Sequence, residues 1–298
     1  MTVSTPASAK GPPSDRYRRV IEGIDNLPSL PAIVTKLLEV VNSSETSADD
    51  ATRLIEKDPA LTSKFIRLAN SAFYGMPRAV SSVSSAVVIL GFNVIRSVVL
   101  SASLMKMFTE QKNQTINKDK FWKHSIATAL SAKEIVRHLM GFKLFDPESA
   151  FCAGILHDIG KLIFDEYVFP DYKAACDYAK NFKVPLIEAE SQVLGINHAG
   201  IGRILADKWA LPLDLEEAIV FHHEPQGAGE HVEPVAIAHV ADAIAHDIGA
   251  DLWENEARTP LWEQSRELLH IDDAAYDKIK AASANVMTNS VEFLTIIR

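Results

Sequence analysis

The chain has 298 residues, a length that suits one large domain or two ordinary ones. Its 47% hydrophobic and 23% charged residues exclude wholesale disorder. The net charge of −9 is uneven, because residues 1–120 carry 15 Lys and Arg against 11 Asp and Glu, whereas the rest carries 15 against 28. The acidic second half would repel a polyanion, which argues against a general nucleic-acid binder.

Targeting and redox signals point to the cytoplasm. The first 20 residues lack the apolar segment of a signal peptide, and no run of about 18 apolar residues indicates a membrane span. The two cysteines, Cys152 and Cys176, lack zinc-finger spacing and suit a reducing compartment. We therefore expect a cytoplasmic protein with no membrane contact.

The first part of the chain predicts a tail followed by helices. Residues 1–14, rich in Ser, Thr, Ala and Pro, predict a disordered tail, and residues 15–115 predict an N-terminal helical subdomain. Within this subdomain, Asp58 before a proline is expected to be the N-cap of a helix. Ser84 is expected to cap the next helix, and Gly91 to end it before a further helix begins.

The second part also predicts helices throughout. A polar linker over residues 109–120 leads into a second helical subdomain, residues 116–250. Apolar spacing predicts helices over 121–140 and, as one continuous element, over 149–164. Further helices are expected to start at Pro170 and Pro185 and to cover residues 198–209, 212–223 and 234–247. Residues 251–298 predict a C-terminal helical extension that packs on the core or mediates a homodimer. No segment predicts a strand, so the fold class is all-α.

Adjacent His157 and Asp158 lie in an otherwise apolar segment. On a continuous helix they would point about 100° apart, so they could bracket one metal ion or bridge two. Lys161, four residues after His157, would share its face. A buried Asp is costly unless it is paired with a cation. The alternatives for Asp158 are a helix N-cap or a simple salt bridge.

Other His and Asp residues also interrupt apolar helices. His198 heads a buried stripe, although a core histidine bonded to a carbonyl would explain it as well. Asp242 lies among small residues, and a local pairing with His239 or His246 is the alternative for it. Imidazole and carboxylate donors together suit a transition metal. The candidate metal ligands are His124, His157, Asp158, His198, His222, His223 and Asp242. The remaining histidines are expected outside this site: His138, His231, His239, His246 and His270.

The order of these residues resembles the HD superfamily of metal-dependent phosphohydrolases. The segments HDIGK (157–161), HAGIG (198–202) and HHE (222–224) are similar to the HD-GYP phosphodiesterase branch of that superfamily. This resemblance implies two bound metal ions, iron or manganese, with Asp158 as a catalytic ligand and Lys161 contacting phosphate. The chain departs from the branch in two places: Gly-Tyr-Pro does not follow HHE, and Lys120 stands where some members have a Glu.

The stretch DPAL…LANSAFYG resembles the HDOD domain, an HD-related module of bacterial signalling proteins, and the resemblance covers roughly residues 20–225. It implies a regulatory protein whose partners are signalling proteins or a nucleotide or phosphate ligand. Three hypotheses follow: a regulatory module that binds metal and ligand without turnover, a metal-dependent phosphohydrolase, and a purely structural His/Asp network. The first is the main prediction and the hydrolase is the alternative.

Overall fold

The computed structural model describes residues 29–43, 45–71, 79–108, 115–139 and 145–289. The predicted tail, residues 1–14, lies outside the described residues. Within the described ranges every regular element is a helix and there is no strand. The predicted all-α fold class is therefore confirmed.

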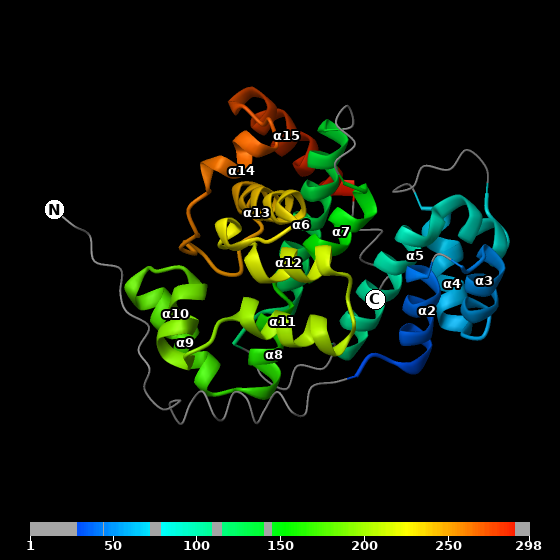
Figure 1. Ribbon diagram of the computed structural model, residues 1–298. Coiled ribbons are helices and arrows are strands. Elements are labelled where there is room, and N and C mark those ends of the chain that lie inside the picture. The colour runs from blue at the N-terminus through cyan, green and yellow to red at the C-terminus, as the bar shows by residue number, and fades with distance from the viewer. Residues whose placement is uncertain (1–28, 44, 72–78, 109–114, 140–144, 290–298) are drawn as a thin grey trace.

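Four helices form the N-terminal part, which lies to one side of the molecule in Figure 1. They are α2 (Ala32–Asn42), α3 (Ala48–Ile55), α4 (Pro59–Ala69) and α5 (Val83–Met107). The Asp58 side chain accepts hydrogen bonds from the first turn of α4, which confirms the predicted N-cap. Ser82 rather than Ser84 caps α5. Gly91 interrupts α5 with φ 78° and ψ 169°, a conformation that favours glycine, so the predicted helix break is confirmed.

Helix α5 is long and apolar enough to cross a membrane by length and composition, and it is the one such helix in the described part of the chain. However, 61% of its most apolar window is buried inside the molecule. The break at Gly91 also divides it into two shorter pieces. These features are typical of the core helix of a soluble protein.

The remaining helices form the larger part of the molecule (Figure 1). They are α6 (Lys118–His138), α7 (Pro147–Leu156), α8 (Ile159–Tyr167), α9 (Asp171–Phe182), α10 (Leu186–Leu194), α11 (His198–Lys208), α12 (Leu213–Phe221), η1 (Pro225–Gly227), α13 (Val232–Asp247), α14 (Glu263–Leu268) and α15 (Asp273–Asn289). The predicted starts at Pro170 and Pro185 are confirmed. The single helix predicted over 149–164 is instead two helices, α7 and α8.

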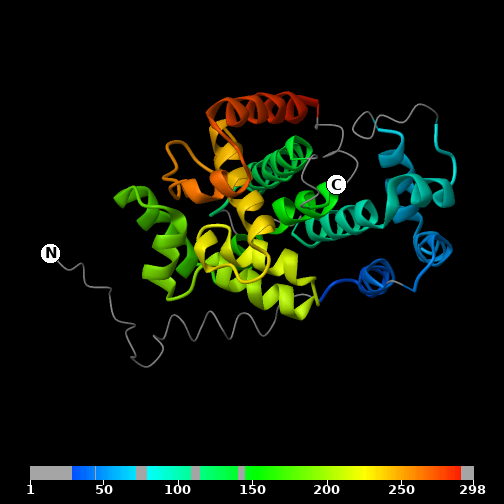
Figure 2. The same cartoon turned by 45° about the horizontal axis from the view of Figure 1, so that its top comes forward.

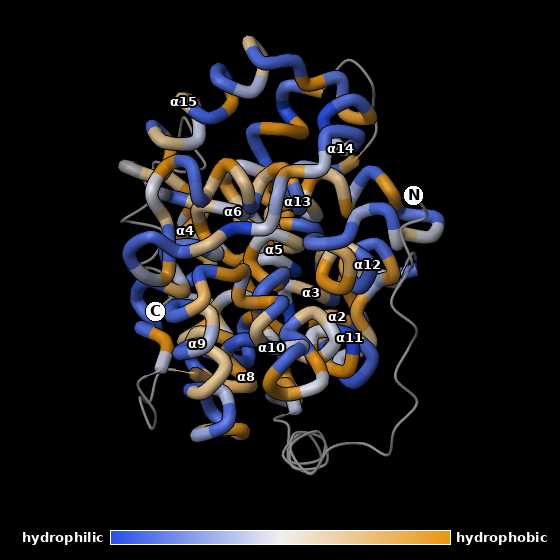
Figure 3. Tube along the Cα trace, turned by 90° about the vertical axis from the view of Figure 1, so that its left-hand side faces the viewer, coloured by the Kyte–Doolittle hydropathy of each residue, from blue (hydrophilic) through white to orange (hydrophobic). Residues whose placement is uncertain are grey.

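The core is continuous between the two predicted subdomains. One cluster of buried apolar side chains extends from α2 to α13 and includes both Leu104 and Phe121, on either side of the predicted boundary. A second cluster joins α6 and α13 to α14 and α15. Figure 2 shows α15 lying along this side of the molecule, against α6 and α13. In the trace of Figure 3, many helices carry both hydrophilic and hydrophobic residues, as expected for amphipathic helices that pack with one face on a core. The division at residues 115 and 250 stays a prediction.

A very close approach of α6 and α7 fixes the centre of this fold. A Cβ on Gly154 would lie 2.4 Å from the Cα of Ala129, so the two helix backbones touch. Gly154 is therefore needed for the packing. The contact brings the end of α7, and the His-Asp pair that follows it, against the middle of α6.

Candidate metal centre

The His-Asp pair sits at a break between two helices. Helix α7 ends at Leu156 and α8 begins at Ile159, with Asp158 at φ −100° and ψ 5°. The pair therefore does not lie on one continuous helix, which corrects the sequence-based prediction. Asp158 occupies the N-cap position of α8 but makes no capping hydrogen bond. Its Oδ2 instead accepts from Lys161 Nζ at 2.6 Å, so Asp158 is the N-cap residue by position and its carboxylate forms the alternative salt bridge.

The structure brings all seven predicted ligands together at one place. His124 comes from the middle of α6, His198 is the first residue of α11, and Asp242 lies on α13. His222 and His223 follow the end of α12. Six of the seven side chains are buried and His223 is half-buried. Their grouping was predictable from residue type, but their role as ligands stays a prediction.

Asp158 lies between two groups of imidazoles. Its Oδ2 is 3.3 Å from His157 Nε2 and 3.5 Å from His124 Nε2. Its Oδ1 is 3.2 Å from His198 Nε2 and 3.6 Å from His222 Nε2. One carboxylate therefore faces both groups, each through a different oxygen. This is the arrangement that a carboxylate bridging two ions requires.

One further ligand completes each group. In the first group, Asp242 Oδ1 lies 3.1 Å from His124 Nε2 and 3.7 Å from His157 Nε2. In the second group, His223 Nε2 lies 3.1 Å from His198 Nε2. The donor atoms within each group all lie within 4.8 Å of one another. Each group is therefore small enough to surround a single ion.

Backbone carbonyls fix the orientation of three imidazoles. The Nδ1 atoms of His124, His157 and His222 donate to the carbonyls of Ala250, Gly154 and Ile219 at 2.9, 2.8 and 2.7 Å respectively. A carbonyl can only accept a hydrogen bond, so the Nδ1 atom carries the proton in each case. The Nε2 lone pairs consequently face the centre of the cluster. Partners of this kind orient metal-binding histidines in proteins.

Some of the inward-facing atoms lack hydrogen-bond partners. The Nε2 atoms of His124 and His157 are 3.3 Å apart and face each other. Asp158 Oδ1 and His222 Nε2 are buried and make no hydrogen bond. Buried acceptors that face one another are unfavourable unless a cation lies between them. The donor set therefore fits two divalent transition-metal ions.

Electrostatics within the cluster show the same demand for a cation. Burial disfavours a charged His157 ring, but Asp158 and Asp242 overcome this and raise its pKa to about 10. Burial lowers the pKa of His222 to about 4. Burial would raise the pKa of Asp158, but the His157 and Lys161 cations hold it well below its usual range. Without metal the cluster therefore holds a proton at His157, where a metal ion could replace it.

Two residues that support His198 were not predicted. Glu190 on α10 is fully buried and accepts from both the Nδ1 and the backbone N of His198, at 2.5 and 2.8 Å. A Cβ on Gly160 would lie 2.1 Å from the carbonyl oxygen of His198, so α8 directly touches the start of α11. The glycine of HDIGK therefore has a packing role. Glu190 gave no sequence signal, because its partner lies on a different helix.

His246 lies beside the cluster, contrary to expectation. Its Nε2 is 3.6 Å from Asp242 Oδ1 and its ring centre is 4.8 Å from that of His124. Its Nδ1 donates to Asp251 at 2.6 Å. His239 reaches the site only through the backbone carbonyl of His222. The other three expected outsiders belong to none of the His/Asp/Glu groups found in the described residues: His138, His231 and His270.

A cavity of about 300 Å³ opens beside the first group. Asp242 and His246 form part of one wall on α13. The rest of the lining includes Arg258, Arg266 and Tyr276 of the C-terminal extension. A ligand in this cavity would contact both the candidate metal centre and two arginines.

The chain matches a known protein family over most of its length. The model of the HDOD domain matches residues 27–225, well over half of the chain. The chain belongs to the HDOD family. The match contains His124, the HDIGK segment, His198 and the HHE segment, while Asp242 and the cavity wall lie beyond it.

Two solved structures share the fold of this HDOD protein, and a further protein matches it in sequence. A Shewanella amazonensis structure, named as a candidate phosphohydrolase, is 26% identical with a TM-score of 0.72 and covers 94% of this chain and 98% of its own. A Marinobacter aquaeolei structure, named as a candidate signal transduction protein, is 18% identical with a TM-score of 0.77. The match covers 95% of this chain and 65% of the Marinobacter chain. A Treponema pallidum protein is 24% identical over 217 residues, 72% of this chain. The chain spans only 41% of that relative's length.

Proposed function

We propose that this HDOD protein is a regulatory module that binds two divalent transition-metal ions and, through them, a phosphate-bearing ligand without turnover. The observation that carries the proposal is the cluster of facing imidazole and carboxylate atoms around Asp158, in which Asp158 Oδ1 and His222 Nε2 are buried without a hydrogen bond. One ion would be held by His124, His157 and Asp242, and the other by His198 and the HHE histidines. Asp158 would bridge the two.

The cavity beside Asp242 supports a phosphate-bearing ligand. Its arginines, Arg258 and Arg266, offer guanidinium groups whose geometry matches phosphate oxygens. They are partly neutralised, because Arg258 bonds Asp247 and Arg266 bonds Asp273. The solved relative named as a signal transduction protein supports the regulatory role. By resemblance, iron or manganese is the expected metal, and signalling proteins are the expected partners.

Phosphoester hydrolysis is the second candidate function. When bound, such an ion pair supplies Lewis-acid polarisation of a phosphoester and an activated water nucleophile. The opening beside Asp242 would admit a substrate to that pair. Lys161 is nearly fully buried and bonds Asp158, so its contribution in the structure is to hold that carboxylate in place and stabilise its charge. A direct contact between Lys161 and phosphate stays a prediction.

Metal analysis tests the proposal. Protein purified without an affinity tag or chelator, and reconstituted anaerobically with Fe²⁺ or Mn²⁺, is expected to hold two equivalents by mass spectrometry. His157→Ala and Asp158→Ala are expected to lose them. His270→Asn is the matched control, because His270 is exposed, lies outside the cluster and has a left-handed backbone (φ 52°) that Asn tolerates. If the wild-type protein held no metal after reconstitution, the proposal would be wrong and the cluster would be a structural hydrogen-bonded network.

Assays on the metal-loaded protein distinguish the regulatory module from the hydrolase. Inorganic phosphate and bis(p-nitrophenyl) phosphate are suitable probes. Saturable phosphate binding without release of nitrophenol supports the regulatory module. Metal-dependent release of nitrophenol that is lost in Asp158→Ala supports the hydrolase. Failure of metal-loaded protein to bind either probe would contradict both.

A further inference from the structure

His246 lies on α13 one turn after Asp242, at the edge of the first group of candidate ligands. Its side chain is buried, with 8% exposure of the residue, and it lines the cavity beside that group. Its ring centre is 4.8 Å from that of His124. The segments HDIGK, HAGIG and HHE do not include it, so no motif of the sequence assigns it a role.

The carboxylate of Asp251 fixes the orientation of the His246 ring. His246 Nδ1 donates to Asp251 Oδ1 at 2.6 Å. An ionised carboxylate can only accept a hydrogen bond, so Nδ1 carries the proton and Nε2 presents its lone pair. Histidines that bind metal ions in proteins commonly have this kind of carboxylate partner on the other ring nitrogen.

The Nε2 atom of His246 lies toward the first group. It is 3.6 Å from Asp242 Oδ1, which is too far for a hydrogen bond. The same oxygen is 3.1 Å from His124 Nε2 and 3.7 Å from His157 Nε2. Two ligand atoms that are each about 2.1 Å from one ion lie about 3.0–4.2 Å apart, according to the angle between them. The three imidazoles therefore surround the Asp242 oxygen at distances typical of ligands that share an ion.

A separate ion on the Nδ1 side of the ring is the alternative. His246, Asp251 and Glu256 also have donor atoms within 4.8 Å of one another. These atoms already have partners, because Asp251 accepts from His246 and Glu256 Oε2 accepts from the backbone N of Leu252 at 2.7 Å. Arg258 lies 3.4 Å from Asp251 and would repel a cation there. The contacts therefore favour metal binding through Nε2.

We propose that His246 is a further ligand of the first ion, bound through Nε2, with Asp251 as the positioning residue behind it. This inference rests on the function proposed above, because it requires the two-ion centre. With His246, the first ion has three imidazoles and two carboxylates, which leaves an octahedral ion a single open position. That position accepts an oxygen of a phosphate-bearing ligand but not a water nucleophile as well, which favours binding without turnover.

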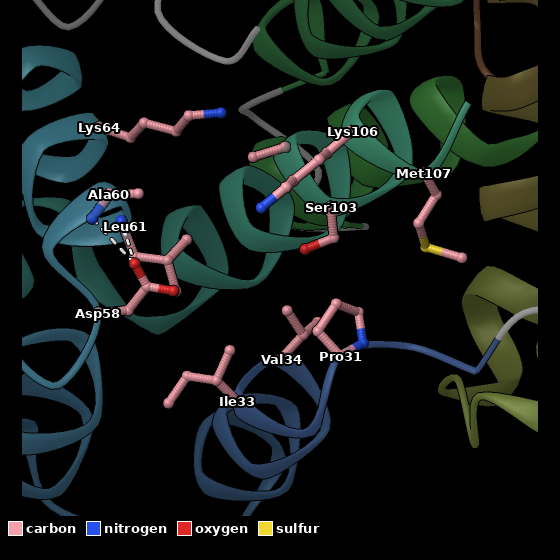
Figure 4. A pocket seen from close by; sticks show the side chains of 11 residues that line it. Pro31, Ile33, Val34, Asp58, Ala60, Leu61, Lys64, Ser103, Lys106 and Met107 are labelled. Atoms are coloured by element: carbon pink, nitrogen blue, oxygen red, sulfur yellow. Dashed lines mark hydrogen bonds between the residues drawn. The ribbon is translucent and has the colours of Figure 1, made fainter. Parts of the chain in front are cut away.

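The cavity on the N-terminal helices offers no comparable set of ligands. Helices α2, α4 and α5 line it (Figure 4), its volume is about 350 Å³, and its lining contains no histidine or cysteine. The one carboxylate in the lining, Asp58, caps α4. Metal binding at this cavity is therefore not expected to compete with the His/Asp cluster.

Titration of chelator-treated protein with Mn²⁺, followed by the electron paramagnetic resonance signal of the free ion, tests the proposal. His246→Ala and His246→Asn are each expected to weaken one of the two bound ions at least about tenfold and to leave the other nearly unchanged. Asparagine retains a donor near the position of Nδ1, so it preserves the contact with Asp251, but it has no atom in place of Nε2. His138→Asn is the matched control, because His138 is exposed at the end of α6, and both dissociation constants are expected to equal those of the wild type.

Free imidazole distinguishes a metal ligand from a residue with a structural role only. In His246→Ala, imidazole can enter the cavity beside Asp242 and supply the missing nitrogen. It is therefore expected to restore Mn²⁺ affinity, at concentrations that leave the affinity of the wild type unchanged. Pyrrole has the same ring size but no nitrogen lone pair for a metal ion, and it is expected to restore nothing.

Two kinds of failure can be told apart. Unchanged dissociation constants in both His246 variants, or a loss of affinity that imidazole does not restore, would overturn this proposal and leave the two-ion centre intact. Wild-type protein that binds no Mn²⁺ would contradict the proposed function, and the role of His246 as a ligand would be wrong with it.

Discussion

The substitution Gly160→Ala tests whether the HDIGK glycine maintains the metal centre by allowing two helices to touch. A new Cβ at this position would lie 2.1 Å from the carbonyl oxygen and 2.8 Å from the carbonyl carbon of His198. Both atoms belong to the backbone at the start of α11, so no side-chain rotation can relieve the overlap. Helix α8 must therefore move away from α11 by about 1 Å to reach ordinary van der Waals contact.

The cost of this movement can be estimated. Overpacking in a close-packed interior costs about 1–3 kcal/mol, and an overlap with rigid backbone falls toward the upper end. At about 2–4 °C per kcal/mol, a cost near 3 kcal/mol lowers Tm by about 6–12 °C. The same movement separates Asp158 from His198, whose facing atoms are 3.2 Å apart. Metal in the second group is therefore expected to fall along with stability.

Thermal denaturation of metal-free protein measures the packing cost, and mass spectrometry of reconstituted protein measures the metal. Gly200→Ala is the matched control, because it also lies near the start of α11 but its new Cβ would meet side chains only, with Ile196 at 3.0 Å as the tight contact and Asn197 at 3.6 Å. That side chain can shift, and alanine favours the helix, so Tm is expected to stay close to that of the wild type. Wild-type Tm and a full metal complement in Gly160→Ala would refute the reasoning.

Three further predictions concern the metal centre and its cavity. Glu190→Gln is expected to weaken metal binding about 10–100-fold, because Glu190 orients His198; unchanged affinity would show that the orientation is not needed. The pKa of His157 in the metal-free protein, about 10 against an unperturbed 6.5, means that metal binding near neutral pH displaces a proton. Calorimetry in two buffers of different ionisation enthalpy should detect that release, and metal affinity should rise with pH toward about 10. The stabilisation that this proton gives the metal-free fold is complete below pH 6.5 and is lost as the pH rises through 10. Arg258→Lys is expected to weaken inorganic phosphate binding about tenfold without changing metal content, because a lysine ammonium cannot make the bidentate contact of a planar guanidinium. Loss of metal in this variant would show instead that Arg258 has a structural role only.

Local chemistry made much of the fold predictable. The carboxylate of Asp58 and the backbone freedom of Gly91 act within one turn of chain, so their consequences could be derived without tertiary structure. The choice between Ser82 and Ser84 could not, because both are serines near the start of the same helix. Which serine becomes the N-cap of α5 depends on the residue at which the helix begins to pack against the core.

Tertiary contacts account for what the sequence did not predict at the site. The segment around His157 and Asp158 is apolar and contains no proline, so its periodicity predicts one unbroken helix. The observed break follows the contact between Gly160 and His198, which lie on different helices. Glu190 was missed for the same reason. His246, by contrast, was already visible as an i+4 neighbour of Asp242.

Helix α7 joins the N-terminal helices to the metal centre. At its first turn, Ser149 accepts a hydrogen bond from Arg96 of α5 at 2.6 Å, and the carbonyl of Glu148 accepts one from Ser97 at 3.0 Å. Its last turn leads directly into His157, whose Nδ1 donates to the carbonyl of Gly154. Because a helix transmits displacement along its axis with little compression, a shift of α5 would move His157, a candidate ligand, together with the start of α7. The N-terminal helices are therefore part of the structural support of the candidate metal centre, in keeping with the hydrophobic core that continues across the predicted subdomain boundary.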